Sequence, residues 1–232
     1  MKSCEVMSIT VVQKSKLRKQ IRKRNFYLFT VYCFLFSVFC FLSPVPNLAQ
    51  QKSNSELVDV LSINPTIALD IRYATENNFT HHKLYPVARC LLRREPAESL
   101  SAVQKELKTR GLGLKVFDGY RPLSIQKKLW EAVPDDRYVA NPAKGSRHNR
   151  GAAVDLTIID SLGHELEMPT PFDNFSDTAH CDYMRLPRKV LRNRALLERV
   201  MEHHGFLRMS TEWWHFDFHG WGKFQILDQP LE

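Results

Sequence analysis

Most of this 232-residue chain has few cysteines, no flexible linker and no surplus of positive charge. Three of the five cysteines lie within the first 49 residues, so only Cys90 and Cys181 remain and a disulfide-rich scaffold is excluded. These two can form one bridge in an oxidising compartment or stay as a buried free pair. No internal repeat or low-complexity tract divides residues 50–232, so we expect them to form a single domain.

The excess of positive charge is confined to the first fifth of the chain. The net charge is +8, but residues 1–49 hold eight basic residues and one acidic residue. The remainder holds 25 basic and 24 acidic residues, a net charge of +1. A nucleic-acid-binding domain needs a basic patch or stripe on its folded surface, so this distribution argues against nucleic acid as a partner.

The basic N-terminal segment has the pattern of an export signal. Residues 14–24 (KSKLRKQIRKR) are followed by the uncharged, apolar residues 26–42 and then by a turn-rich, polar exit. This order is typical of a secretory signal, with cleavage expected after Ala49. The alternative is an uncleaved membrane anchor, although 17 apolar residues span only ~26 Å as a helix. In either case we expect residues 50–232 to lie in the periplasm, with membrane contact only through the N-terminal segment.

Strand and helix patterns alternate irregularly in residues 50–232. Strand patterns start at residue 67 and cover residues 113–122, 151–160 and 211–218. Helix patterns cover residues 95–111, 123–133 and 188–205. Without a regular strand-helix-strand repeat, the order predicts an α+β domain with a central antiparallel sheet flanked by helices.

One carboxylate falls inside an otherwise apolar strand. Alternation places Val154, Leu156 and Ile158 on one face of that strand and Asp155 on the other. A carboxylate in such a strand is costly unless it is paired or bound to a metal. Asp155 is therefore either a hydrogen-bonded core residue or a metal ligand.

Two histidines complete a ligand set for zinc. His148 ends a polar loop just before Gly151, and His215 lies in an aromatic strand. Two imidazoles and one carboxylate suit Zn²⁺ and leave a fourth position open for water. Zinc in such a site polarises a carbonyl oxygen and lowers the pKa of a coordinated water. The sequence therefore predicts one zinc ion per chain, held by His148, Asp155 and His215.

Two further residues supply the remaining functions of a hydrolase. Glu212 can act as the general base and later as the acid for a leaving amine. It lies three residues before His215, so both face the zinc only if the strand has a bulge or begins after a bend. Arg121 follows the turn at Asp118-Gly119, where its guanidinium can stabilise an oxyanion or bind a substrate carboxylate.

Two motifs resemble those of zinc peptidases that act on bacterial cell-wall peptides, a superfamily that includes the hedgehog N-domain. They are S-x-H-x-x-G-x-A-x-D, from Ser146 to Asp155, and E-x-W-H, from Glu212 to His215.

Three other stretches narrow the resemblance to the D-alanyl-D-alanine dipeptidases of the vancomycin-resistance type. They are DIRYATENNF (70–79), DGYRP (118–122) and the Phe172-Asp173 pair, and the resemblance spans roughly residues 57–225.

The resemblance implies a hedgehog-like single domain that hydrolyses the D-alanyl-D-alanine dipeptide with zinc, in cell-wall peptide turnover. Glu212 would be the general acid/base, Arg121 would stabilise the transition state, and Ser146, Asp173 and Tyr73 would lie near the bound dipeptide. A carboxypeptidase or endopeptidase acting on longer wall peptides is the alternative enzyme. A non-catalytic, zinc-containing wall-binding module is the third hypothesis, and the presence of Glu212 argues against it.

Overall fold

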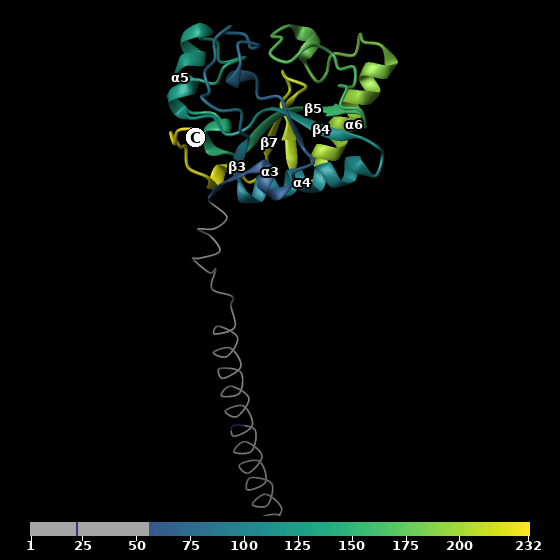
Figure 1. The fold of residues 1–232 in the computed structure, drawn as a ribbon, viewed down its shortest axis with the longest axis horizontal. Coiled ribbons are helices and arrows are strands. Elements are labelled where there is room, and N and C mark those ends of the chain that lie inside the picture. Colours follow the sequence, from purple (N-terminus) through teal and green to yellow (C-terminus); the bar gives the residue numbers. More distant parts are fainter. Residues whose placement is uncertain (1–21, 23–55) are drawn as a thin grey trace, which may run out of the picture. The chain divides into compact units, whose positions relative to one another are not determined.

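The computed structural model describes Arg22 and residues 56–232 (Figure 1). Apart from Arg22, the predicted leader of residues 1–49 lies outside the described residues, and its cleavage or retention stays a prediction. Within the described part, no helix is both long and apolar enough to cross a membrane.

Seven strands and four α-helices make up the described domain. The strands are β1 (Leu57–Asp59), β2 (Ala68–Leu69), β3 (Leu91–Arg93), β4 (Gly113–Asp118), β5 (Ala153–Ile159), β6 (Phe206–Arg208) and β7 (His215–Phe218). The helices are α3 (Val60–Ile63), α4 (Arg94–Lys108), α5 (Leu123–Ala132) and α6 (Arg188–His203). Short 3-10 turns lie at η1 (Arg72–Ala74), η2 (His148–Arg150), η3 (Asp177–Ala179) and η4 (Trp221–Lys223).

A five-stranded sheet in the order β2-β4-β5-β7-β6 forms the centre of the domain. Its β4-β5, β5-β7 and β7-β6 pairs are antiparallel, and only the edge strand β2 runs parallel to its neighbour β4. A separate antiparallel pair joins β1 and β3. The predicted α+β class with a central antiparallel sheet and flanking helices is therefore confirmed.

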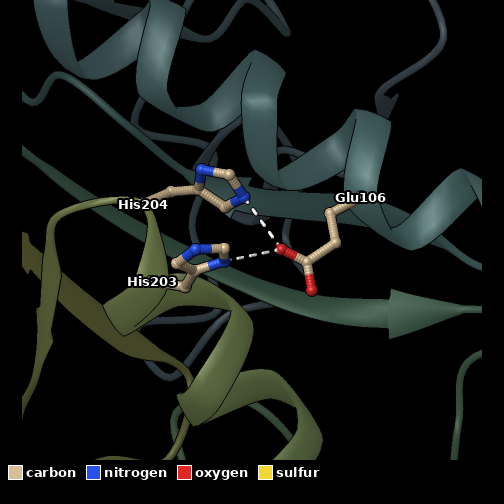
Figure 2. A group of neighbouring side chains, drawn as sticks. All are labelled: Glu106, His203 and His204. Atoms are coloured by element: carbon tan, nitrogen blue, oxygen red, sulfur yellow. Dashed lines mark hydrogen bonds and ion pairs between the residues drawn. The ribbon is translucent and has the colours of Figure 1, made fainter.

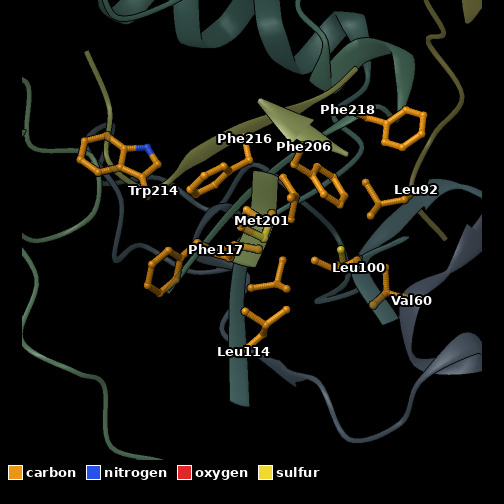
Figure 3. Packing of buried hydrophobic residues seen from close by; sticks show 14 of the residues in the cluster. Val60, Leu92, Leu100, Leu114, Phe117, Met201, Phe206, Trp214, Phe216 and Phe218 are labelled. Atoms are coloured by element: carbon orange, nitrogen blue, oxygen red, sulfur yellow. The ribbon is translucent and has the colours of Figure 1, made fainter. Parts of the chain in front are cut away.

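The hydrophobic core lies where α4 and α6 pack against each other and against β4 and β5. Figure 3 shows Leu100 of α4 and Met201 of α6 beside Leu114, Phe206 and Phe216 of the sheet. All seven residues of β5 are buried, as expected for a central strand covered on both faces. Asp155 is the third residue of this fully buried strand.

The short strands and the strand ends differ from the predicted pattern. The strand predicted over residues 211–218 begins only at His215. The strand within 113–122 ends at Asp118, at the turn predicted for Asp118-Gly119. The strand character at residue 67 is limited to Ala68–Leu69. Strands β1, β3 and β6 and the four-residue helix α3 were not predicted from the sequence, because elements of three or four residues are too short to show a periodic pattern.

A register shift in β4 brings a second carboxylate to the face of Asp155. Val116 pairs with Leu156, but the next pair joins Asp118 to Asp155, so β4 carries one extra residue. Residues directly opposite each other in a ladder share a face, and a bulge changes which residues are opposite. Without it, Asp118 would share the face of Val116 and point toward the packed helices.

Both cysteines of the described domain are free thiols. The Cys181 thiol donates to the Met209 carbonyl at 3.0 Å, and Cys90 is fully buried. Of the two alternatives left open by the sequence, the structure has the buried free pair.

Candidate active site

One pocket gathers every site residue expected from the sequence. Its walls include Tyr73, Arg121, Ser146, His148, Asp155, Asp173, Glu212 and His215. These residues come from segments up to 142 positions apart, so the fold itself assembles the site.

The three predicted zinc ligands converge on one point. His215 Nδ1 lies 3.0 Å from Asp155 Oδ1 and 3.1 Å from His148 Nε2, and His148 Nε2 lies 3.4 Å from the same carboxylate oxygen. All three side chains are buried. Tetrahedral ligands at ~2.0–2.1 Å from a zinc ion would be about 3.3 Å apart, so the observed spacing fits zinc.

Hydrogen bonds on the far side of each imidazole decide which nitrogen faces the site. His148 Nδ1 donates to the Gly119 carbonyl at 2.7 Å, and His215 Nε2 donates to Asp217 Oδ1 at 3.0 Å. Neutral rings with these protons present bare lone pairs at His148 Nε2 and His215 Nδ1. Two nitrogen lone pairs and a carboxylate oxygen then face one another, which is repulsive unless a cation lies between them.

The electrostatics of the site also favour positive charge. Burial alone would lower the pKa of His215, but Asp217 and Asp155 raise it well above its ordinary value. Burial opposes ionisation of Asp155, yet His148 and His215 hold the pKa of that carboxyl below its ordinary value. The donor set is thus an ionised carboxylate with two imidazoles, which suits Zn²⁺.

Strand register and one left-handed residue place the ligands. Asp155 and His215 are directly opposite each other in the β5-β7 ladder and therefore share a face. His148 begins η2, which turns into β5 through Gly151 at φ 64°. Glycine adopts this conformation without steric cost, and a Cβ there would lie 2.6 Å from Leu57 Cδ2.

Glu212 reaches the site because it lies before β7 and not in it. The 212–215 segment forms a turn in which the His215 amide donates to the Glu212 carbonyl at 3.3 Å. Glu212 Oε2 consequently lies 4.0 Å from His215 Nδ1. Because of this bend, Glu212 and His215 face the same site although strand alternation would place residues three apart on opposite faces. Burial raises the pKa of Glu212 to about 7, with His215 opposing that shift.

Arg121 is held by a buried carboxylate and an amide. Its Nε and Nη2 donate to Asp118 Oδ2 at 3.0 and 2.6 Å, and its Nη1 donates to Gln126 Oε1 at 2.9 Å. Burial would lower the pKa of Arg121, but Asp118 keeps it above its ordinary value. The guanidinium is therefore charged and fixed, with Nη2 3.9 Å from Asp155 Oδ2.

Asp173 and Tyr73 form a polar end of the pocket. The Tyr73 hydroxyl lies 3.3 Å from both carboxylate oxygens of Asp173. Burial and the neighbouring charge of Asp155 raise the pKa of Asp173 well above its ordinary value. Ser146 lies nearer the ligands, where its hydroxyl accepts from the His148 amide at 3.2 Å.

Two carboxylates that support the site residues were not predicted from the sequence. Asp217 accepts from His215, and its position two residues further along the same strand was a usable signal for a shared face. Asp118 accepts from Arg121, from the Tyr85 hydroxyl at 2.8 Å and from the Gly119 amide at 2.9 Å. Asp118 stands in the DGYRP motif, but its contact with Arg121 could not be predicted, since the β4 bulge decides the direction of its side chain.

Comparison with known proteins gives one consistent family. A family model described as D-ala-D-ala dipeptidase (Peptidase_M15) matches residues 53–230. A D-alanyl-D-alanine dipeptidase of Escherichia coli (strain K12) is 39% identical over 163 residues, covering 70% of this chain and 84% of the relative. A D-alanyl-D-alanine dipeptidase of Enterococcus faecium is 33% identical over 168 residues, covering 63% of this chain and 83% of the relative. A solved structure of vancomycin resistance D,D-dipeptidase VanXYg with a D-Ala-D-Ala phosphinate analog is 19% identical, with a TM-score of 0.37 and coverage of 71% and 67%.

Removing the acceptor behind His215 should weaken zinc binding. Asp217→Ala leaves the His215 tautomer unfixed, and we expect zinc affinity to fall about 10–100-fold. Asp217→Asn keeps a carbonyl oxygen at the same place and should lose less. Chelator competition measures both variants, and equal affinities in all three proteins would contradict the role of Asp217.

Replacing Asp173 should stabilise the fold at neutral pH. The raised pKa means that the native state resists ionisation of Asp173, so its carboxyl lowers stability as pH rises above ~4, the unfolded value. At pH 7, Asp173→Asn should therefore unfold at a higher denaturant concentration than the wild type. Near pH 3, the two proteins should unfold at the same denaturant concentration. Asparagine also tolerates the left-handed backbone of this residue, φ 58°.

The matched control is Asp160→Asn, which should act in the opposite direction. Hydrogen bonds from the His164 amide lower the pKa of Asp160, so its ionised form stabilises the fold above that pKa. If Asp173→Asn destabilised the protein at pH 7, as Asp160→Asn should, ionisation of the buried Asp173 carboxyl would not be what lowers the stability of the fold.

Proposed function

The chain belongs to the D-Ala-D-Ala dipeptidase family, and from this we propose that it hydrolyses the dipeptide D-alanyl-D-alanine with zinc in cell-wall peptide turnover. One observation carries the proposal. The pocket that contains Asp173 is also lined by a buried donor set suited to zinc and by the fixed guanidinium of Arg121. The carboxylate of Glu212 lies in the same pocket, 4.0 Å from His215 Nδ1.

His148, Asp155 and His215 would hold the zinc ion, which would supply Lewis-acid chemistry: polarisation of a carbonyl and activation of water near neutral pH. Glu212 accepts the proton that the attacking water loses as its oxygen bonds to the scissile carbonyl carbon. The same carboxyl then delivers that proton to the leaving nitrogen as the C–N bond breaks. The products are two molecules of D-alanine.

Arg121 faces the negative charge that develops on the carbonyl oxygen. Its guanidinium is already oriented by Asp118 and Gln126, so little reorganisation is needed when the charge appears. The low exposure of the side chain strengthens this interaction relative to water.

The far end of the pocket fits a free amine. Asp173 is a carboxylate whose ionisation an ammonium group would favour, and Tyr73 holds it in place. Aromatic rings close that end, since Phe175 packs on Phe79 and Tyr138 with centroids 5.3 and 4.8 Å apart. An amine site inside such a wall selects a dipeptide over a longer wall peptide.

A substrate panel tests the proposal. The purified chain with one equivalent of zinc is incubated with D-Ala-D-Ala, L-Ala-L-Ala and a wall pentapeptide ending in D-Ala-D-Ala. We expect release of D-alanine from the first substrate only. Cleavage of the pentapeptide would instead favour the carboxypeptidase hypothesis, and no cleavage of any substrate would favour a binding module.

Glu212→Gln should separate catalysis from zinc binding. Glutamine cannot take the proton, so we expect kcat to fall about 10²–10⁴-fold while zinc content stays at one per chain. Glu98→Gln, at an exposed position on α4, is the control and should keep full activity. Near-wild-type turnover in Glu212→Gln would refute the general-base assignment.

We also propose that residues 1–49 export the domain to the periplasm. The basic cluster at 14–24 and the apolar run at 26–42 support this, and the family match begins only at residue 53. The N-terminal segment thus lies outside the enzyme domain, where a signal or anchor is expected.

Fractionation of a Gram-negative host and intact-mass measurement test the export proposal. Cleavage after Ala49 should give a periplasmic protein that starts at Gln50, whereas an anchor should keep the full mass in the inner membrane. Leu35→Arg introduces a charge into the apolar run and should retain the protein in the cytoplasm. A full-length wild-type protein found in the cytosol would contradict the proposal.

A further inference from the structure

Two histidines and a glutamate meet at the ends of α4 and α6, away from the pocket. His203 is the last residue of α6, His204 is its C-cap, and Glu106 lies in the last turn of α4. His203 Nδ1 and His204 Nε2 each lie 3.0 Å from Glu106 Oε2, and Figure 2 shows both rings turned toward that one oxygen. None of the three lines the pocket.

The three donor atoms have the arrangement of a metal site. They lie within 4.8 Å of one another, and neutral imidazole with carboxylate suits Zn²⁺, Cu²⁺ or Ni²⁺. Arg110 donates to Glu106 Oε1 at 3.3 Å, which leaves Oε2 as the oxygen that faces the histidines. The His203 side chain is 71% exposed, so water can complete the coordination sphere.

The backbone also favours a cation at this place. The C-terminal ends of α4 and α6 lie together there, and each carries partial negative charge on its last carbonyls. The charge of Arg110 on the other carboxylate oxygen opposes a cation, so binding should be weaker than in the buried site.

We propose that Glu106, His203 and His204 form a second site for a divalent transition metal, which links α4 to α6. The bound ion replaces the two ring protons that otherwise point at Glu106. Because the ligands come from two helices packed on the sheet, binding stabilises the folded domain and leaves the chemistry of the pocket unchanged.

Zinc titration of the purified full chain tests this second site. We expect two binding phases in the wild type and one in the His203→Asn/His204→Asn variant, which keeps polar contacts but removes the imidazoles. Glu106→Gln should weaken the second phase. His148→Asn should lose the tighter phase and keep the weaker one.

The matched control is His81→Asn/His82→Asn, which removes another adjacent pair of exposed histidines. It should retain both phases. Dipeptidase activity of His203→Asn/His204→Asn with one zinc equivalent should equal that of the wild type. The second site is detected by zinc binding, so this test remains valid even if the chain shows no dipeptidase activity.

Thermal unfolding gives the second readout. Zinc beyond the first equivalent should raise the Tm of the wild type and of the His81/His82 control, and should leave the Tm of His203→Asn/His204→Asn unchanged. Mg²⁺, which prefers oxygen ligands, should have no effect. A single binding phase in the wild type, or a second phase that persists in His203→Asn/His204→Asn, would overturn the proposal.

Discussion

Convergence of three lone pairs in a buried space is the constraint on which the site depends. His148, Asp155 and His215 point acceptor atoms at one another across 3.0–3.4 Å. Such an arrangement is repulsive without a cation, so the fold must hold it in place by other interactions. The all-buried strand β5 and the direct pairing of Asp155 with His215 supply that support. Packing of the core thus offsets the unfavourable free energy of bringing these ligand atoms together, and the resulting arrangement strongly favours zinc.

A second set of carboxylates and carbonyls determines the direction of the two ligand histidines and of Arg121. The Gly119 carbonyl and Asp217 fix the two imidazoles, and Asp118 fixes Arg121. Each acts on a neighbour and not on the substrate. The catalytic groups therefore need little rearrangement during a reaction, which is the condition for strong electrostatic stabilisation of a transition state.

The two histidine-carboxylate clusters differ in their surroundings more than in their composition. In the pocket, burial and neighbouring charges shift the pKa values of Asp155 and His215, whereas at Glu106 solvent reaches His203, whose side chain is 71% exposed. The histidine rings beside Glu106 can donate hydrogen bonds from their own ring protons to its carboxylate, so that cluster is stable with or without a metal. In the pocket, the outer nitrogens of His148 and His215 are committed to the Gly119 carbonyl and to Asp217. The inner nitrogens therefore face Asp155, and a cation between them, a proton or a metal ion, relieves the repulsion.

The sequence alone determined the class of fold, the three long helices α4, α5 and α6, the core strand and the identity of the residues that gather in the pocket. Motifs such as S-x-H-x-x-G-x-A-x-D specify residue types at fixed spacing, and apolar periodicity over seven or more residues is strong. Only the tertiary structure decided the position of Glu212 before β7, the direction of Asp118 and the contact between Asp217 and His215. A bend, a bulge and a hydrogen bond depend on how strands pair, and single-chain periodicity carries no information about pairing. The same reason explains Glu106, His203 and His204, which meet only because two helices nearly 100 residues apart pack side by side.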